Sequence, residues 1–118
     1  AKYHAAASIL SNQVIAVLDM GYSLLEDCGF TRAEAVRATG QLVMRNIENV
    51  LEAGCDGALT GPIERNDIET VKKHIACMQN DDSDDVRLYK MLGTKLVNIA
   101  EKKNPDKDYT QMMELLRG

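Results

Sequence analysis

The sequence predicts a single all-α domain of about five helices, a helical bundle with a long first helix. Apolar residues recur along the whole chain with the 3.6-residue period of amphipathic helices, and no stretch alternates as a strand does. Helix-ending glycines and helix-starting polar residues separate the periodic segments. A length of 118 residues suits one core, so residues 1–118 are expected to form one domain.

The five expected helices cover about residues 2–27, 31–54, 66–79, 86–103 and 107–116. Gly29 can cap the first helix in the left-handed conformation. Thr31 and Glu34 have the spacing of a capping box, and Asn66 and Glu69 repeat it at the third helix. The acidic run at residues 80–85 is expected to cap the fourth helix, where negative charge suits the N-terminal end.

Three glycines interrupt helices in an unusual place. Gly21, Gly40 and Gly93 each fall within the apolar sector of a helix, where glycine costs about 1 kcal/mol relative to alanine. Close helix crossings, within the chain or across a dimer interface, would offset that cost. Incidental glycines remain an equally good interpretation of any one of them.

The composition excludes several classes of partner. The net charge is −4, and the basic residues are scattered, so no positive surface for nucleic acid is expected. No apolar run approaches the roughly 18–20 residues of a membrane span, which predicts a soluble, cytoplasmic protein without a membrane partner. Three cysteines without a paired spacing are expected to be reduced thiols. His74 and Cys77 are an incidental pair, and no metal site is predicted.

Short polar side chains form a stripe along the first helix. On a wheel of 100° per residue, one sector holds the residues His4, Ser8, Ser11, Asn12, Asp19, Tyr22, Ser23 and Glu26. Most polar stripes face solvent, but a solvent face usually recruits Lys, Glu and Arg. The nearly uncharged first half therefore favours a covered cleft at His4, Ser8 and Asn12, whereas solvent remains the better interpretation for Ser23 and Glu26.

A second unusual segment, LTGPIERND at residues 59–67, joins the second and third helices. Gly61 and Pro62 fix a turn, and the amides of the following helix start favour an anion or a carbonyl oxygen. Arg65 adds a positive charge beside them. Taken alone, this segment is more simply an interhelical turn.

Together the two segments carry a resemblance. YHAAA at residues 3–7 with Ser11-Asn12, followed by residues 59–67, resembles the C-terminal helical domain, domain of unknown function 2520, of Rossmann-like NAD(P)-dependent oxidoreductases. Its wider relatives are pyrroline-5-carboxylate reductase, ketopantoate reductase, and the 6-phosphogluconate and β-hydroxyacid dehydrogenases. The resemblance implies a fold like the C-terminal domain of 6-phosphogluconate dehydrogenase. It also implies an N-terminal Rossmann domain, absent from this chain, that binds NAD(P), and a homodimer formed through the helical domain.

The resemblance also suggests site residues. Many relatives place a lysine and an asparagine four residues apart on this first helix, for proton transfer and substrate binding during hydride transfer. Asn12 matches the asparagine, but Ser8 stands where the lysine would be. His4, one turn earlier, is a candidate proton donor because imidazole changes protonation near neutral pH. The expected catalytic residues are thus His4, Ser8 and Asn12, and the expected substrate-binding residues are Ser11, Thr60, Gly61, Pro62, Arg65 and Asp67.

The chain contains no G-x-G-x-x-G turn and no room for a βαβ unit, so it is not expected to bind a dinucleotide or to be active by itself. The predicted function is the substrate-side and dimerisation domain of an NAD(P)-dependent oxidoreductase acting on a small carbonyl, imine or hydroxy acid. The alternative is a non-catalytic helical interaction module.

Overall fold

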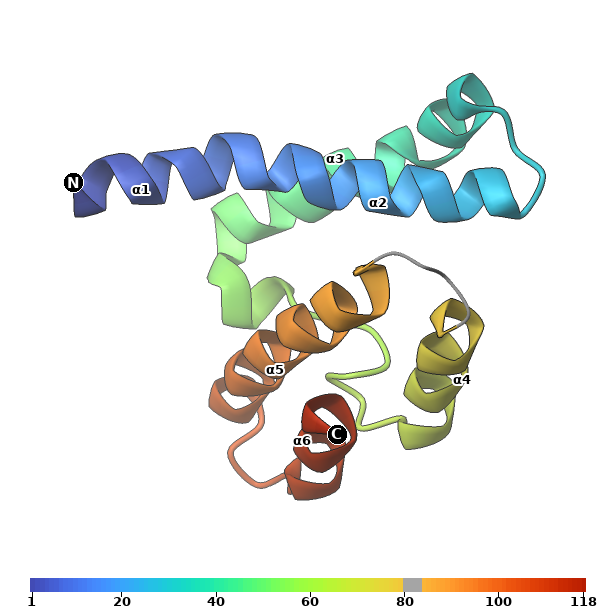
Figure 1. The fold of residues 1–118 in the computed structure, drawn as a ribbon. Helices are drawn as coiled ribbons and strands as arrows, with labels where there is room; N and C mark the ends of the chain where they lie inside the picture. The colour runs from blue at the N-terminus through green and yellow to red at the C-terminus, as the bar shows by residue number, and fades with distance from the viewer. Residues whose placement is uncertain (80–83) are drawn as a thin grey trace. The chain divides into compact units, whose positions relative to one another are not determined.

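The described residues, 1–79 and 84–118 of a computed structural model, confirm the all-α class (Figure 1). The first helix is long and continuous and consists of α1 (Lys2–Ser8), the π-helical turn η1 (Ile9–Gln13) and α2 (Val14–Asp27). It is followed by α3 (Arg32–Ala58), α4 (Ile68–Met78), α5 (Asp85–Lys103) and α6 (Thr110–Arg117). Five helices with a long first one are therefore present in the described part of the chain, as predicted.

The chain divides into two compact units, Ala1–Met44 and Arg45–Gly118. The first unit contains α1, η1, α2 and the beginning of α3, and the second contains the rest. Each unit is described below by itself.

The predicted end of the first helix is confirmed in detail. Gly29 has a φ of 103°, and its N–H donates to the Glu26 carbonyl oxygen at 2.9 Å. The Phe30 N–H donates to the Leu25 carbonyl oxygen at 3.2 Å. These two bonds form a Schellman motif, which requires a left-handed residue at the position of Gly29.

The predicted capping box at the start of α3 is also present. The Thr31 N–H donates to the Glu34 carboxylate at 2.9 Å, and the Glu34 N–H donates to the Thr31 hydroxyl oxygen at 3.1 Å. Hydrogen bonds from Thr31 lower the pKa of Glu34. At its other end, α3 is interrupted at Gly54, where φ is 78°, close to the predicted helix end, and one further turn follows to Ala58.

The predicted start of the third helix at Asn66 is wrong by one residue. Asp67 is the N-cap of α4, and its carboxylate accepts from the Thr70 N–H at 3.1 Å and the Thr70 hydroxyl at 2.8 Å. Asn66 lies just before the helix with a φ of 61°, so Glu69 is not its capping partner. Aspartate and asparagine both cap helices well, and the spacing alone did not separate them.

Most of the acidic run predicted to cap the fourth helix lies outside the described residues, which omit 80–83. Asp84 is the N-cap of α5 by position, without a capping hydrogen bond from its side chain. Lys102 and Lys103 lie in the last turn, as predicted from the helix dipole.

The core of the second unit is where α4, α5 and α6 meet. Its buried side chains are Ile63, Val71, Ile75, Val97, Ala100, Tyr109, Met112 and Leu116. Gly93 of α5 faces this core, and a Cβ atom there would lie 2.8 Å from Leu116 Cδ2. The predicted close crossing at Gly93 is therefore confirmed. At Gly21 and Gly40 a Cβ would meet nothing within 4 Å, so these two glycines have no crossing partner among residues 1–79 and 84–118.

The first unit has little core of its own. Ala35 is the one buried residue in residues 1–44, all of which are described. Large apolar side chains are exposed along both of its helices, among them Tyr3, Leu10, Ile15 and Leu42 at 89%, 77%, 63% and 71%. The first unit by itself thus leaves large apolar side chains of both helices uncovered.

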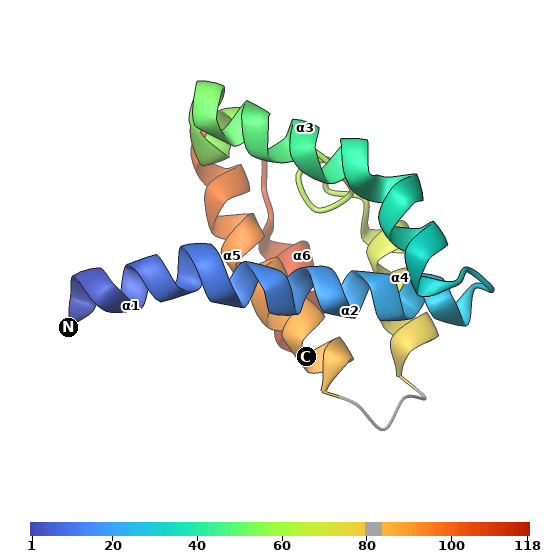
Figure 2. The ribbon, with the colours of Figure 1, turned by 90° about the horizontal axis from the view of Figure 1, so that it is seen from above.

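One expectation drawn from composition needs correction. Figure 2 shows the long first helix, α1 to α2, along its length. This helix, Lys2–Asp27, is long and apolar enough to cross a membrane, by length and composition alone, with a mean hydropathy of 1.2. The sequence contains no long uninterrupted apolar run, but averaging over 18 residues lets alanine and aliphatic residues outweigh the polar ones. Core helices of soluble proteins and N-terminal signal sequences meet the same criterion.

Candidate functional site

The three residues predicted to be catalytic lie on the exposed N-terminal half of the long helix. His4 lies on α1, and Ser8, which is half-buried, is the last residue of α1. Asn12 lies in the π turn η1. Ser11, in the same turn, donates its hydroxyl hydrogen to the Ala7 carbonyl oxygen at 2.6 Å, a bond within the helix. The structure therefore leaves His4, Ser8 and Asn12 accessible from outside.

The π turn changes which residues share a face. The Ser8 hydroxyl donates to Gln13 Oε1 at 3.4 Å, a long hydrogen bond between residues five apart. A π-helical turn aligns residues i and i+5, whereas an α-helix aligns i and i+4. Ser8 is thus aligned with Gln13, one position later than in a regular helix. The single stripe drawn at 100° per residue is wrong across residues 9–13.

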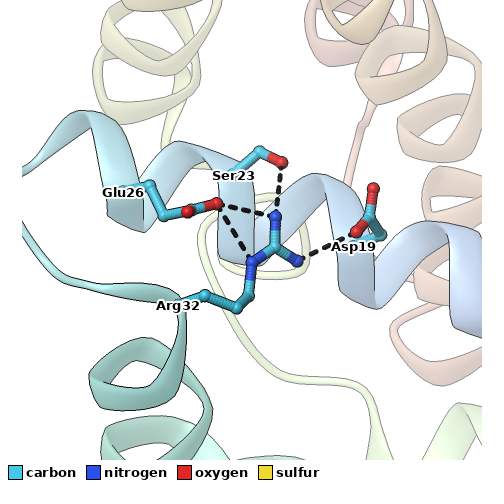
Figure 3. Close-up of polar contacts among 4 residues, drawn as sticks. All are labelled: Asp19, Ser23, Glu26 and Arg32. Carbon is cyan, nitrogen blue, oxygen red and sulfur yellow. Dashed lines mark hydrogen bonds and ion pairs between the residues drawn. The ribbon is translucent and has the colours of Figure 1, made fainter.

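The second half of the predicted stripe is tied to a single arginine (Figure 3). Arg32, at the start of α3, donates to Glu26 Oε1 at 2.6 and 3.0 Å, to Asp19 Oδ1 at 2.9 Å and to the Ser23 hydroxyl oxygen at 3.1 Å. The Tyr22 ring lies 5.6 Å from the guanidinium carbon. The hydrogen bonds that Arg32 donates to Glu26 and Asp19 raise the pKa of Arg32.

These contacts give the second half of the stripe, Asp19, Ser23 and Glu26, a structural role at the corner between α2 and α3. A planar guanidinium with several donors suits such a multiply bonded position. The solvent interpretation made for Ser23 and Glu26 is therefore incomplete, because Arg32 engages both side chains.

The second segment forms the loop between α3 and α4. Gly61 has a φ of 97°, and the Gly61 and Pro62 carbonyl oxygens accept from the Arg65 and Asp67 N–H groups at 3.0 and 2.8 Å. The Gly-Pro pair therefore fixes a turn, as predicted.

The loop is held by residues near the end of the chain. Tyr109, only 3% exposed, donates its hydroxyl hydrogen to the Glu64 carbonyl oxygen at 2.6 Å. Asn104 Nδ2 donates to Glu64 Oε2 at 3.1 Å, and Asn66 Nδ2 donates to the Asp108 carbonyl oxygen at 2.8 Å. In the structure these side chains serve as supports for the loop.

The N-terminus of α4, which was expected to attract an anion, is already bonded to a negative group of the chain, the Asp67 carboxylate. The Asp67 carboxylate accepts from the first turn of α4, and these bonds lower its pKa, as does the charge of Arg65 to a smaller extent. Arg65 is exposed, and among the described residues its guanidinium forms no hydrogen bond or ion pair. Arg65 thus remains the accessible charged group of this segment.

Thr60 lines a cavity of about 220 Å3 with Cys55, Leu59 and Leu96. The larger cavity of about 630 Å3 lies between α5 and α6 and includes none of the predicted site residues; Val97, Tyr109, Met113 and Arg117 are among its lining residues. The first predicted segment belongs to one unit and the second to the other.

The cysteines and the His74–Cys77 pair offer no metal chemistry in the described part of the chain. His74 Nδ1 and the Tyr89 hydroxyl form a hydrogen bond of 2.9 Å, and the Cys77 thiol donates to the His74 carbonyl oxygen at 3.0 Å. Within the described ranges, no three His, Cys, Asp or Glu side chains are grouped to hold a metal. Burial raises the pKa of Tyr89, so its hydroxyl stays protonated at neutral pH.

Three contributors were missed at the sequence level: Gln13, Arg32 and Tyr109. Gln13 needs the π turn, for which the sequence gives no recognised signal. Arg32 is a helix-start residue whose partners precede it by six to thirteen positions, and Tyr109 contacts Glu64 across 45 positions. Only the structure reveals contacts between residues this far apart in the sequence.

Taken together, these features define a class of protein: an all-α domain whose first helix carries accessible polar groups around a π turn. Residues 1–96 match the family described as Domain of unknown function (DUF2520), and the chain belongs to this family. The matched segment includes both predicted segments and ends within α5. No curated protein and no solved structure matches the chain.

Proposed function

We propose that this chain is the substrate-side and dimerisation domain of an NAD(P)-dependent oxidoreductase acting on a small carbonyl, imine or hydroxy acid. The observation that carries the proposal is the accessible, nearly uncharged polar surface at His4, Ser8 and Asn12, on a helix with little core around it. Such a surface suits a reacting substrate held between this helix and another domain.

The described residues do not fit a dinucleotide by themselves. They form no strand and therefore lack the glycine-rich turn between strand and helix that binds a pyrophosphate. In this proposal NAD(P) is bound mainly by a Rossmann domain preceding residue 1 in the parent protein, and it supplies the hydride when bound. This chain alone is expected to bind no cofactor and to have no activity.

The chain's own residues would then serve the substrate. His4 would exchange a proton with the substrate oxygen or nitrogen, and Ser8 and Asn12 would hold the substrate by hydrogen bonds. Ser11, Thr60, Gly61, Pro62, Arg65 and Asp67 would line or brace the pocket. For Asp67 and Ser11 the bracing role agrees best with their hydrogen bonds inside the fold.

The parent reading frame upstream of Ala1 provides the first test. A strand followed by a glycine-rich turn is expected there, and its absence would reject the oxidoreductase proposal. If it is present, the purified parent protein should bind NADPH. His4→Ala and Asn12→Ala should then lower turnover of any substrate found, while Asn98→Ala, on the exposed surface of α5, should not.

The dimer part of the proposal rests on the first unit. A cavity of about 170 Å3 on this unit is lined by Gly21 and largely apolar neighbours, including Val17, Leu25 and Val43. The open space at Gly21 and Gly40 allows close approach of a second helix. A second copy of the chain suits this surface, because a two-fold symmetric dimer packs the same apolar helices of both copies against each other.

Sedimentation velocity tests the dimer. Wild type is expected to sediment as a dimer, and Val17→Glu as a monomer, because a charge in the groove would lose its water on association. Met91→Glu is the matched control, since Met91 is an exposed apolar residue of the second unit, and it should remain dimeric. A dimer that survives Val17→Glu would place the interface elsewhere.

The alternative function, a non-catalytic helical interaction module, is favoured by the same exposed apolar faces. It predicts partner binding without NADPH binding by the parent protein. Both versions include, as part of the proposal, a cytoplasmic location without nucleic acid or membrane partners. The net charge of −4 supports the absence of nucleic acid, and the polar residues Ser11, Asn12 and Gln13 midway along Lys2–Asp27 speak against a membrane span.

A further inference from the structure

The cavity between α5 and α6 reaches down to the core of the second unit. Its volume is about 630 Å3, within the range of sites that bind small molecules. Val97 and Tyr109, both buried core residues, are among its lining residues, and so is the half-buried Met113. A ligand in this cavity would therefore meet an apolar floor, on which a tyrosine ring and a methionine sulfur favour contact with an aromatic group.

The segment that leads into α6 and lines this cavity is held in place by bonds within the fold. The Thr110 N–H and hydroxyl donate to Asp108 Oδ1 at 2.9 and 2.6 Å, and these bonds lower the Asp108 pKa. The Tyr109 hydroxyl donates to the Glu64 carbonyl oxygen at 2.6 Å, and Lys107 Nζ lies 3.6 Å from Glu64 Oε2. This part of the wall is therefore formed before a ligand binds, as is usual for small-molecule sites.

Three charged side chains at the cavity remain available to a ligand. Glu101 of α5 and Glu114 and Arg117 of α6 all line it and are exposed. Within residues 1–79 and 84–118, none of the three forms a hydrogen bond or an ion pair. Glu114 and Arg117 are three positions apart and share one face of α6, whereas Glu101 lies across the cavity on α5. Carboxylates and a guanidinium thus stand around one apolar floor.

We propose that the cavity between α5 and α6 binds a free α-amino acid with an aromatic side chain. The ammonium group of the ligand pairs with the Glu101 and Glu114 carboxylates, and its carboxylate accepts from the Arg117 guanidinium. Its ring packs on Tyr109 and Met113. A zwitterion engages both signs of charge, whereas a simple amine or acid engages only one. The inference is independent of the proposed oxidoreductase function, because no residue assigned to that site lines this cavity.

NMR titration of the isotope-labelled chain with L-phenylalanine measures the binding. The backbone amides of residues 107–117 are expected to shift, and the shifts should saturate with a Kd of about 1 mM or lower. Three further probes each lack one feature of the ligand: phenethylamine lacks the carboxylate, hydrocinnamate lacks the ammonium group, and glycine lacks the ring. Each of them should bind at least about tenfold more weakly than L-phenylalanine.

Two variants test the charged groups directly. Glu101→Gln and Arg117→Gln remove one charge each, and each should raise the Kd for L-phenylalanine about fivefold or more. Arg117→Gln should leave the weak binding of phenethylamine unchanged, because that probe has no carboxylate to lose its partner. The matched controls are Glu48→Gln and Arg45→Gln, exposed residues of α3 that do not line the cavity, and both should leave every Kd unchanged.

The outcomes test the site and its ligand separately. If about 10 mM L-phenylalanine causes no saturable shift, or shifts only amides outside α5, α6 and the segment between them, the site is overturned. If phenethylamine or hydrocinnamate binds as tightly as L-phenylalanine, or if neither variant changes the Kd, the zwitterion assignment is overturned. Far-UV circular dichroism of each variant should match wild type, and the probe series on wild type decides the assignment if a variant fails to fold. NADPH binding by the parent protein tests the oxidoreductase function and does not enter this experiment.

Discussion

Replacing Gly93 by alanine tests how closely α5 and α6 pack. Alanine gains about 1 kcal/mol in helix propensity over glycine. The new Cβ would lie 2.8 and 3.1 Å from the two Leu116 methyl carbons and 3.4 Å from Ile63 Cδ1, closer than van der Waals contact for the first two. Overpacking of this kind costs about 1–3 kcal/mol. The two effects together predict that Gly93→Ala lowers the free energy of unfolding by about 0–2 kcal/mol.

Gly21→Ala and Gly40→Ala are the matched controls. Each lies inside a helix, and neither would bring a Cβ within 4 Å of another atom, so the propensity gain should appear unopposed. Each is expected to raise the free energy of unfolding by about 0.5–1 kcal/mol at concentrations where the chain is monomeric. The three variants differ only in what surrounds the new methyl group.

Urea unfolding followed by far-UV circular dichroism measures the three variants. A Gly93→Ala chain stabilised as much as the other two would refute the close crossing of α5 and α6. Leu116→Ala provides a further check, since it removes the methyl carbons that the new Cβ would meet. In that background Gly93→Ala should become stabilising by about 1 kcal/mol, and the difference between backgrounds measures the contact.

Three further predictions concern the loop, the α4 cap and the membrane. Tyr109→Phe leaves the Glu64 carbonyl oxygen without its donor and should cost about 1–3 kcal/mol in urea unfolding; an unchanged midpoint would mean that the bond adds nothing. Asp67→Ala removes the α4 cap and should lower Tm at neutral pH. Because hydrogen bonds from Thr70 lower the Asp67 pKa below 3.8, the cap stabilises the fold above about that pH and loses its effect as pH falls through the folded-state pKa. The Tm difference between wild type and Asp67→Ala should therefore shrink in acid. The chain should stay out of liposomes of neutral lipid in a flotation assay, and flotation with the vesicles would instead support a membrane role for Lys2–Asp27.

The helices were predictable because short-range chemistry determines them. The Schellman motif at Gly29 and the capping box at Thr31 use residues within five positions of one another, and the sequence displays both. The α4 cap moved by one residue because Asn66 and Asp67 are both good caps. The left-handed conformation of Asn66 is a loop property that spacing does not reveal.

Contacts between distant positions were not predictable in the same way. The three glycines looked alike on helical wheels. In the part of the chain that the structure describes, Gly93 alone of the three lies against another helix, because α6 returns to pack on α5. In the loop at residues 59–67, Glu64 and Asn66, neither of which was a predicted site residue, are bonded to the segment between α5 and α6. That segment follows the part of the chain matched by the family, so the bracing depends on residues outside the shared motif.

The polar stripe shows how one local deviation alters a functional interpretation. At 100° per residue, the residues His4, Ser8, Asn12 and Asp19 fall on one face of a single helix, so the sequence suggests one role for the whole stripe. The π turn at residues 9–13 rotates everything after it, and the structure then separates two groups with different chemistry. After the turn, Asp19, Ser23 and Glu26 are engaged by Arg32 and stabilise a corner. Before it, His4 and Ser8 have no charged partner, and Gln13 joins them because a five-residue turn brings it over Ser8. The described residues of the stripe therefore form a group that Arg32 engages at the α2–α3 corner and a separate, nearly uncharged group on α1 and η1, to which the proposed function assigns the substrate.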